Sequence, residues 1–211
     1  MDYEKLKKRD SSLDILRIIA VFTVLSVHFF LHNGFYSQTV EDKPMYIAVV
    51  MRTLFSACDP LFMLLTGYLM SKKELSKKYY SGITKTLVVF VISTLACMIY
   101  KNIAQGDIFN LKSFILGTLD FTGSNYSWYI EMYICLFLLI PFLNLIYKCL
   151  DTQRKKQILI VTFLALTAIP ISLNWSATQL FPAYFTSLYP VSFYFIGAYI
   201  HEYKPKFRKL W

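Results

Sequence analysis

The sequence is poor in glycine and in acidic residues, and it lacks the cysteine pattern of disulfide-stabilised proteins. Of its 211 residues only 7 are glycine and 13 are acidic, and the chain shows no internal repeat and no low-complexity tract. His28 and His32 have the i, i+4 spacing of metal ligands, but no third ligand accompanies them, so we predict no metal site. The cysteines lack C-x-x-C spacing, which argues against a zinc site or a disulfide framework. They are Cys58, Cys97, Cys135 and Cys149.

Long apolar blocks are what the sequence has in abundance. Hydrophobic residues make up 56% of the chain and aromatic residues 18%. Crossing a bilayer as a helix takes about 20 mostly apolar residues, and no segment has the strict alternation of a membrane β-strand. We therefore expect an all-α integral membrane helical bundle that forms a single domain over residues 1–211. Six transmembrane helices are predicted at about 13–33, 46–71, 83–104, 128–148, 157–174 and 188–203.

Basic residues are distributed unevenly between the connections of these apolar segments. Seventeen lie at the two ends of the chain and in alternate connections, whereas the other connections hold only Lys43, Lys101 and Lys112. Cytoplasmic loops of membrane proteins carry the excess of Lys and Arg, so we expect both termini to be cytoplasmic. The net charge of +9 then reflects topology and contact with anionic membrane lipids. We expect no nucleic acid partner.

The first apolar segment contains ionisable side chains, and burying these inside a bilayer is energetically unfavourable. Arg17 and His28 are eleven residues apart, which places them within about 20° of each other on one helix face and roughly 16 Å apart along the axis. Asp14 is one turn before Arg17 and close enough to pair with it. Ionisable residues within a membrane usually mark a functional site. The structural alternatives are that Arg17 extends to the inner headgroups and that a neighbouring helix satisfies His28.

The second apolar segment places a carboxylate at a similar depth. Arg52, Asp59 and Thr66 follow one another at intervals of seven and therefore share one helix face. Asp59 lies about 18 Å from the cytoplasmic boundary, close to the depth of about 20 Å that we estimate for His28. An aspartate beside a histidine fixes the imidazole tautomer. The alternative is an ion pair between Asp59 and Arg52. Pro60 predicts a kink in this helix.

Four stretches carry recognisable motifs. Arg17 and His28, with ten residues between them, lie within "LDILRIIAVFTVLSVH", and "DPLFMLLTGYLMSKK" combines a small residue, a glycine and an aromatic residue with a basic end. "SWYIEMYICLFLLIPFLNLI" begins with Trp-Tyr and contains Leu-Ile-Pro, and "FYFIGAYI" lies near the end of the chain. In this order and spacing, the stretches resemble the membrane acyltransferase-3 family, in its surface-polysaccharide O-acyltransferase branch.

The resemblance implies transfer of an acyl group, usually acetyl, from cytoplasmic acyl-CoA to a hydroxyl of a cell-surface or lipid-linked glycan. It also implies a multi-pass protein of the bacterial cytoplasmic membrane that uses acyl-CoA as a donor substrate and binds no cofactor. Arg17 and His28 match the R-x10-H signature of the family, and Lys72 matches the basic residue after the glycine motif. Thr66, where serine is commoner, and Trp128 become further substrate-binding candidates. The chain resembles the N-terminal part of a longer family fold, so we expect it to be truncated.

The residues themselves suit such a reaction. Arg17 and Lys72 lie at the predicted cytoplasmic boundary, where the phosphates of CoA arrive. An alcohol needs a general base to attack a thioester, and histidine is the natural one. We infer that Asp59 orients His28. The rival interpretations are a small secondary transporter or proton-coupled carrier, which also uses buried ionisable residues, and a non-catalytic membrane subunit.

Overall fold

The computed structural model describes residues 10–107, 109–124, 126–173 and 182–205. These residues form nine α-helices, two short 3-10 helices and no β-strand. The predicted all-α class is therefore confirmed for the described residues. The chain divides into two compact units, and each is considered by itself. Unit 1 comprises Met1–Leu69 and Ile160–Trp211, and unit 2 comprises Met70–Leu159.

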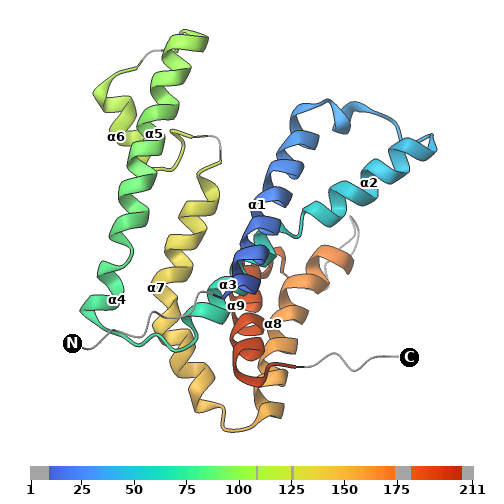
Figure 1. The fold of residues 1–211 in the computed structure, drawn as a ribbon, viewed down its shortest axis with the longest axis vertical. Coiled ribbons are helices and arrows are strands. Elements are labelled where there is room, and N and C mark those ends of the chain that lie inside the picture. The colour runs from blue at the N-terminus through green and yellow to red at the C-terminus, as the bar shows by residue number, and fades with distance from the viewer. Residues whose placement is uncertain (1–9, 108, 125, 174–181, 206–211) are drawn as a thin grey trace. The chain divides into compact units, whose positions relative to one another are not determined.

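Unit 1 opens with a helical hairpin (Figure 1). At the start of its second helix, Asp42 accepts a hydrogen bond from the Met45 N–H at 2.8 Å, which satisfies a donor that has no partner within the helix. The ring of Phe55 packs against Phe22 at 5.9 Å and Phe30 at 6.2 Å, and so joins the two helices. The elements of the hairpin are α1 (Ser11–His32), the 3-10 helix η1 (Phe35–Ser37) and α2 (Lys43–Phe55).

The second predicted transmembrane segment is two helices in the structure. α2 ends at Phe55, and α3 (Cys58–Met70) begins after a turn at Ser56 and Ala57. Pro60 explains the break, because it has no N–H to offer the carbonyl of Ser56 four residues earlier and its ring crowds that carbonyl. The kink expected from Pro60 is therefore a break between two helices, and the predicted span over 46–71 corresponds to the apolar segment Lys43–Met70 that α2 and α3 form together.

Two glycines bring α3 into close contact with α9 (Tyr189–Tyr203) within unit 1. A methyl group added to Gly67 would collide with the backbone carbonyl of Tyr194, and one added to Gly197 would collide with the carbonyl of Leu64. Small residues at a helix crossing allow two backbones to approach each other inside a membrane. The glycines of the "LTGYL" and "FIGAY" stretches therefore have a packing role.

Helix α8 (Gln153–Leu173) begins in unit 2 and continues into unit 1, where it packs on α9. The hydroxyl oxygens of Thr167 and Ser192 lie 3.3 Å apart, and both residues are buried. The rings of Phe163 and Phe195 lie 5.5 Å apart. Hydroxyl pairs and aromatic contacts of this kind join helices without exposing polar groups to lipid.

Unit 2 is built around two long helices, α5 and α7, which Figure 1 shows side by side. Pro141 within α7 cannot donate to the carbonyl of Phe137. The hydroxyl of Tyr79 donates to this carbonyl at 2.6 Å, and its ring stacks on Phe137 with 4.4 Å between the ring centres. Tyr79 thereby replaces the missing hydrogen bond and fastens α4 to α7. The helices of unit 2 are α4 (Lys77–Ser81), α5 (Thr84–Gln105), α6 (Leu111–Leu119) and α7 (Trp128–Cys149), together with the start of α8.

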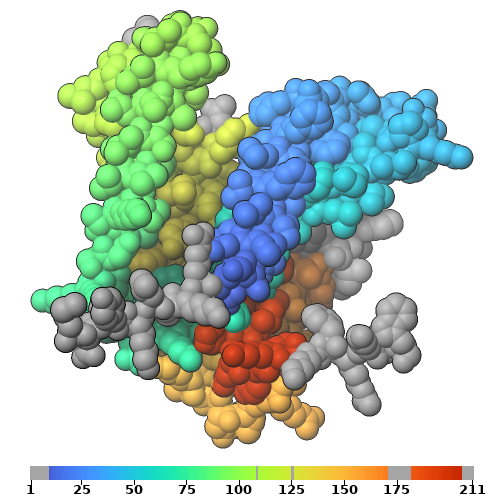
Figure 2. Space-filling view, in the orientation of Figure 1, coloured from blue at the N-terminus to red at the C-terminus, as the bar shows by residue number. Residues whose placement is uncertain are grey.

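Four segments of the described residues are long and apolar enough to cross a membrane. They are Ser11–His32, Lys43–Met70, Lys77–Gln105 and Trp128–Cys149. Helix α1 lies open on the face of unit 1 that Figure 2 shows, and its side chains Ile18, Phe22, Leu25 and Phe29 are more than half exposed. A helix with this exposed apolar surface is suited to lipid rather than water.

The fifth and sixth predicted spans are not among these four segments. The fifth, over 157–174, corresponds to α8, and its last residue lies outside the described residues. The sixth corresponds to α9, which has 15 residues and a length of about 22 Å, short of the roughly 30 Å of a hydrocarbon core. Six transmembrane helices and cytoplasmic termini therefore remain predictions. Residues 1–9 and 206–211, which carry many of the basic side chains, lie outside the described residues.

Candidate active site

The catalytic candidates His28 and Asp59 lie close together within unit 1. His28 is on α1, and its Nδ1 atom is buried. Asp59, in the first turn of α3, is near enough to interact electrostatically with His28. The carboxylate accepts a hydrogen bond from the Cys58 thiol, with 3.6 Å between Sγ and Oδ1, and among the described residues no hydrogen bond joins it to His28. The two predicted residues therefore share one region of unit 1 without direct bonding.

Tyr189 extends this cluster from the start of α9. Its phenol group interacts electrostatically with both Asp59 and Cys58. Tyr189 was not predicted as a site residue, because an aromatic residue before a proline gives no sign that it will lie near a carboxylate of another helix. A phenol O–H can donate to a carboxylate or to a bound hydroxyl, so Tyr189 adds a polar group to the region of the predicted catalytic residues.

Arg52 does not pair with Asp59 in the structure. Its Nε donates to the hydroxyl of Tyr36 at 2.6 Å, and its Nη1 donates to Oγ of Ser56 at 3.4 Å. The guanidinium also lies 5.5 Å from the centre of the Tyr36 ring, in a cation–π contact. The alternative in which Arg52 neutralises Asp59 is therefore wrong.

Arg17 forms the ion pair that its spacing predicts. Its Nη1 lies 2.7 Å from Oδ1 of Asp14, and its side chain is 48% exposed. A guanidinium carries five N–H donors, so the single bond to Asp14 leaves donors that an anionic ligand or a lipid headgroup can use. Arg17 is therefore placed to bind either the phosphates of an acyl-CoA substrate or a lipid headgroup.

The contacts that Thr66 and Trp128 make in the structure lie within their own helices. The hydroxyl of Thr66 donates to the carbonyl of Phe62 at 2.8 Å, which satisfies it within α3. Trp128 is the first residue of α7, is 46% exposed, and packs edge-to-face with Tyr129. Their substrate contacts remain predictions.

Lys72 lines an open cavity of about 570 Å³ within unit 2, formed by the turn after α3, by α4 and by α7. Lys73 and Lys78 line the same cavity, and no carboxylate of the described residues forms an ion pair with any of the three lysines. Glu74 also lines it, but its carboxylate is bonded to Lys148 at 2.8 Å, and this bond lowers the pKa of Glu74. The cavity therefore presents a positively charged surface.

Asn144 holds this basic turn in place. Its Nδ2 atom donates to the carbonyl of Met70 at 2.9 Å and to the carbonyl of Lys73 at 2.7 Å, and the residue is 2% exposed. These bonds join α7 to the last residue of α3 and to the turn that follows it. Sequence reasoning identified Lys72 but interpreted Lys73 and Lys78 only as topology signals, because a run of lysines does not reveal which members share a cavity.

The described residues contain no group of three or more His, Cys, Asp or Glu side chains placed to hold a metal ion. All four cysteines are free thiols, and Cys58 is the buried one. Cys58 is not part of a disulfide. Its thiol lies next to the predicted catalytic residue Asp59.

Comparison with known proteins identifies the family. A model of the acyltransferase domain of the acyltransferase-3 family matches residues 10–211. No curated protein matches the chain, and no solved structure matches it either. The family model covers both units and all of the motifs that suggested the resemblance. The chain therefore belongs to the acyltransferase-3 family and is a membrane acyltransferase.

Proposed function

We propose that the protein is an acyl-CoA-dependent O-acyltransferase of the bacterial cytoplasmic membrane. In this proposal it moves an acyl group such as acetyl to a hydroxyl of a cell-surface or lipid-linked glycan. Family membership supports acyl transfer. The observation that carries the choice of donor is the cavity lined by Lys72, Lys73 and Lys78. Lysine ammonium groups bind phosphate as point charges, and CoA presents several phosphates.

The chemistry needs a base for the acceptor hydroxyl, and His28 supplies it. As the hydroxyl oxygen attacks the thioester carbonyl, His28 takes its proton, and the carbon–sulfur bond then breaks. The CoA thiolate leaves and takes up the proton from the imidazolium. Asp59 favours this imidazolium electrostatically and helps to orient the ring, and the proximity of the two residues supports that role.

The remaining predicted residues act on binding. Arg17, half-exposed on α1, adds a cation for the donor phosphates. Thr66 and Trp128 contact substrate, and the exposed apolar side chains of α1 contact membrane lipids. These assignments follow the family resemblance and the charge of each side chain.

The lysine cavity gives the proposal a direct test. Alanine at Lys72, Lys73 or Lys78 removes a charge-assisted contact to phosphate, so each variant should raise the KM for acetyl-CoA roughly tenfold. The KM for the glycan acceptor should stay within a factor of two or so. Lys77→Ala is the matched control, since Lys77 begins α4 on the same segment but is not among the residues that line the cavity.

Steady-state release of the CoA thiol by purified protein measures both constants. If the three lining lysines and Lys77 have equal effects, the positive charge acts only from a distance, and the cavity is not the donor site. If the protein releases no thiol from acetyl-CoA with any acceptor, the donor assignment itself is wrong.

A further inference from the structure

A second cavity of unit 2, with a volume of about 350 Å³, lies between the first half of α5 and the lining residues Ser124, Tyr126, Ser127 and Ile130. Its lining differs from that of the lysine cavity. Lys85 carries the only charge among the lining residues at neutral pH, and most of the others end in a hydroxyl. The hydroxyl-bearing residues are Thr86, Ser93, Thr94, Ser124, Tyr126 and Ser127.

Thr94 indicates that this cavity is built for a polar ligand. The residue is 0% exposed, and none of the described residues offers a hydrogen-bond partner to its Oγ1 atom. Threonines in helices commonly donate to a carbonyl of the preceding turn, as Thr66 does. A buried hydroxyl without a partner is unfavourable. A ligand in the cavity that Thr94 lines would provide the partner.

The residues just before Ser124 pack closely against α5 beside this cavity. A methyl group added to Gly123 would lie 2.5 Å from Cγ2 of Thr94, so only glycine permits this approach. The Gly123 N–H donates to the carbonyl of Gly117 at 2.8 Å. Phe121 adopts a left-handed backbone conformation with φ of 57°, and its ring stacks on Phe90 at 5.1 Å. A positive φ at a bulky residue is strained, and such strain is concentrated at functional sites.

This irregular backbone lies at the depth of a membrane span. From Thr84 to Thr94, α5 rises about 15 Å, half of a hydrocarbon core, and the candidate span is Lys77–Gln105. Since Gly123 contacts Thr94, residues 121–124 lie near the middle of that span. Non-helical backbone at such depth is tolerated where it is buried in protein or lines a polar cavity.

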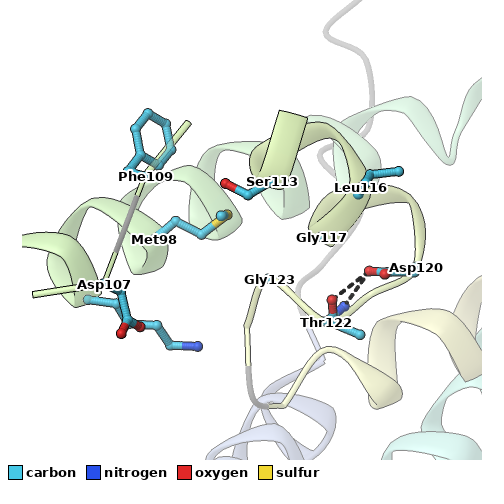
Figure 3. A pocket seen from close by; sticks show the side chains of 10 residues that line it. Met98, Asp107, Phe109, Ser113, Leu116, Gly117, Asp120, Thr122 and Gly123 are labelled. Carbon is cyan, nitrogen blue, oxygen red and sulfur yellow. Dashed lines mark hydrogen bonds between the residues drawn. The ribbon is translucent and has the colours of Figure 1, made fainter. Parts of the chain in front are cut away.

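Another cavity of unit 2, with a volume of about 400 Å³, is lined by Gly123 and has a different character (Figure 3). Lys101, Asp107 and Asp120 line it, so it is charged. Thr122 already engages Asp120, with its hydroxyl at 2.6 Å and its N–H at 3.1 Å, and these bonds lower the pKa of Asp120. The hydroxyl-lined cavity is therefore the better candidate for a neutral ligand.

We propose that the hydroxyl-lined cavity is the acceptor subsite and binds one monosaccharide unit of the glycan. The proposal rests on the proposed function, since it names where the acceptor of that reaction binds. Hydroxyl side chains exchange hydrogen bonds with sugar hydroxyls, and Phe90 and Tyr126 add aromatic surface. The volume is at the small end of ligand pockets, which span roughly 300–1,000 Å³, and so suits a single sugar ring. CoA requires more cations than Lys85, and a lipid chain leaves the hydroxyls unsatisfied.

Binding of a simple sugar tests the subsite without any catalysis. The probes are the methyl glycosides of glucose, galactose and N-acetylglucosamine, added to the full chain in nanodiscs without acetyl-CoA. At least one probe should raise the thermal midpoint of the wild-type protein. Thr94→Val keeps the shape of the side chain but removes the hydroxyl, so it should abolish most of the shift, whereas Thr94→Ser should keep it.

Thr118→Val is the matched control. Oγ1 of Thr118 on α6 is also buried without a hydrogen-bond partner among the described residues, but Thr118 is not one of the cavity's lining residues. The control should show the wild-type shift. Equal shifts for Thr94→Val and wild type, or no shift of the wild-type protein with any probe, would overturn the subsite.

Kinetics separate this proposal from the proposed function. If transfer occurs, Thr94→Val should raise the KM for the acceptor about fivefold and leave the KM for acetyl-CoA unchanged. Transfer with an unchanged acceptor KM leaves the proposed function standing and removes the subsite. If sugar binding depends on Thr94 but no acyl transfer is found, the cavity is a sugar-binding site and the proposed reaction is wrong.

Discussion

At the scale of single residues, Asp59 is the point at which polar groups of unit 1 meet. His28 and Tyr189 both interact with it electrostatically, and the Cys58 thiol donates to it. A carboxylate within a membrane protein is retained only where it has partners or a task. Since Arg52 is occupied by Tyr36, Asp59 is available to act on His28.

Asp59→Asn should lower kcat about 10²-fold, because the amide cannot stabilise an imidazolium as a carboxylate does. The KM for acetyl-CoA should change little. Asp42→Asn is the control: Asp42 caps α2, and asparagine caps a helix as well as aspartate does. Steady-state kinetics of both variants measure the difference. Equal rates for Asp59→Asn and wild type would contradict the orienting role.

Some of these contacts could be predicted from sequence and others could not. Helical periodicity fixes which residues of one helix share a face, and so it predicted the pair of Asp14 and Arg17. Contacts between elements depend on helix rotation and on loop geometry. For that reason the sequence left two possible partners for Asp59 and did not predict the hydrogen bond from Arg52 to Tyr36.

At the scale of elements, the contact between α4 and α7 rests on a proline. Pro141 leaves the carbonyl of Phe137 without its helical donor, and Tyr79 donates to it. Tyr79→Phe should therefore destabilise the protein by about 1–3 kcal/mol, the cost of an unsatisfied buried acceptor. Tyr80→Phe is the control, since the Tyr80 ring lies beside Phe137 without a hydrogen bond of its hydroxyl to that carbonyl.

A double-mutant cycle checks this explanation. Pro141→Ala restores an N–H for the carbonyl of Phe137, so the effect of Tyr79→Phe should shrink in the Pro141→Ala background. The measurement is the thermal or denaturant midpoint of the four proteins in one detergent. Strictly additive effects would show that the hydroxyl of Tyr79 does not replace the missing helical bond.

The elements that apolar periodicity defines were predictable, and the irregular ones were not. The predicted segments 13–33, 83–104 and 128–148 correspond closely to α1, α5 and α7. α6 has 9 residues, too few for a span, and it was not predicted. The packing of residues 120–124 against α5 depends on the close approach of Gly123 to Thr94. A hydropathy profile does not reveal such a contact.

At the scale of the whole molecule, the distribution of basic residues predicts the orientation. Cysteine introduced at Lys77, between the second and third spans, should resist a membrane-impermeant thiol reagent added to intact cells, whereas cysteine at Lys112, near the start of α6, should react. The parent protein with its own four cysteines gives the background. Labelling at Lys77 from outside would reverse the predicted topology.

The central claim is that the protein transfers an acyl group from acyl-CoA with His28 as the base. The most direct measurement is transfer of labelled acetyl from acetyl-CoA to glycan by purified protein in nanodiscs, comparing wild type, His28→Ala and His32→Ala. His32 is one turn beyond His28 on α1 and serves as the matched control. Transfer should fall on the order of 10²–10⁴-fold in His28→Ala and stay near the wild-type rate in His32→Ala. Near-normal transfer by His28→Ala, or no acetyl-CoA-dependent transfer by the wild-type protein, would contradict the claim.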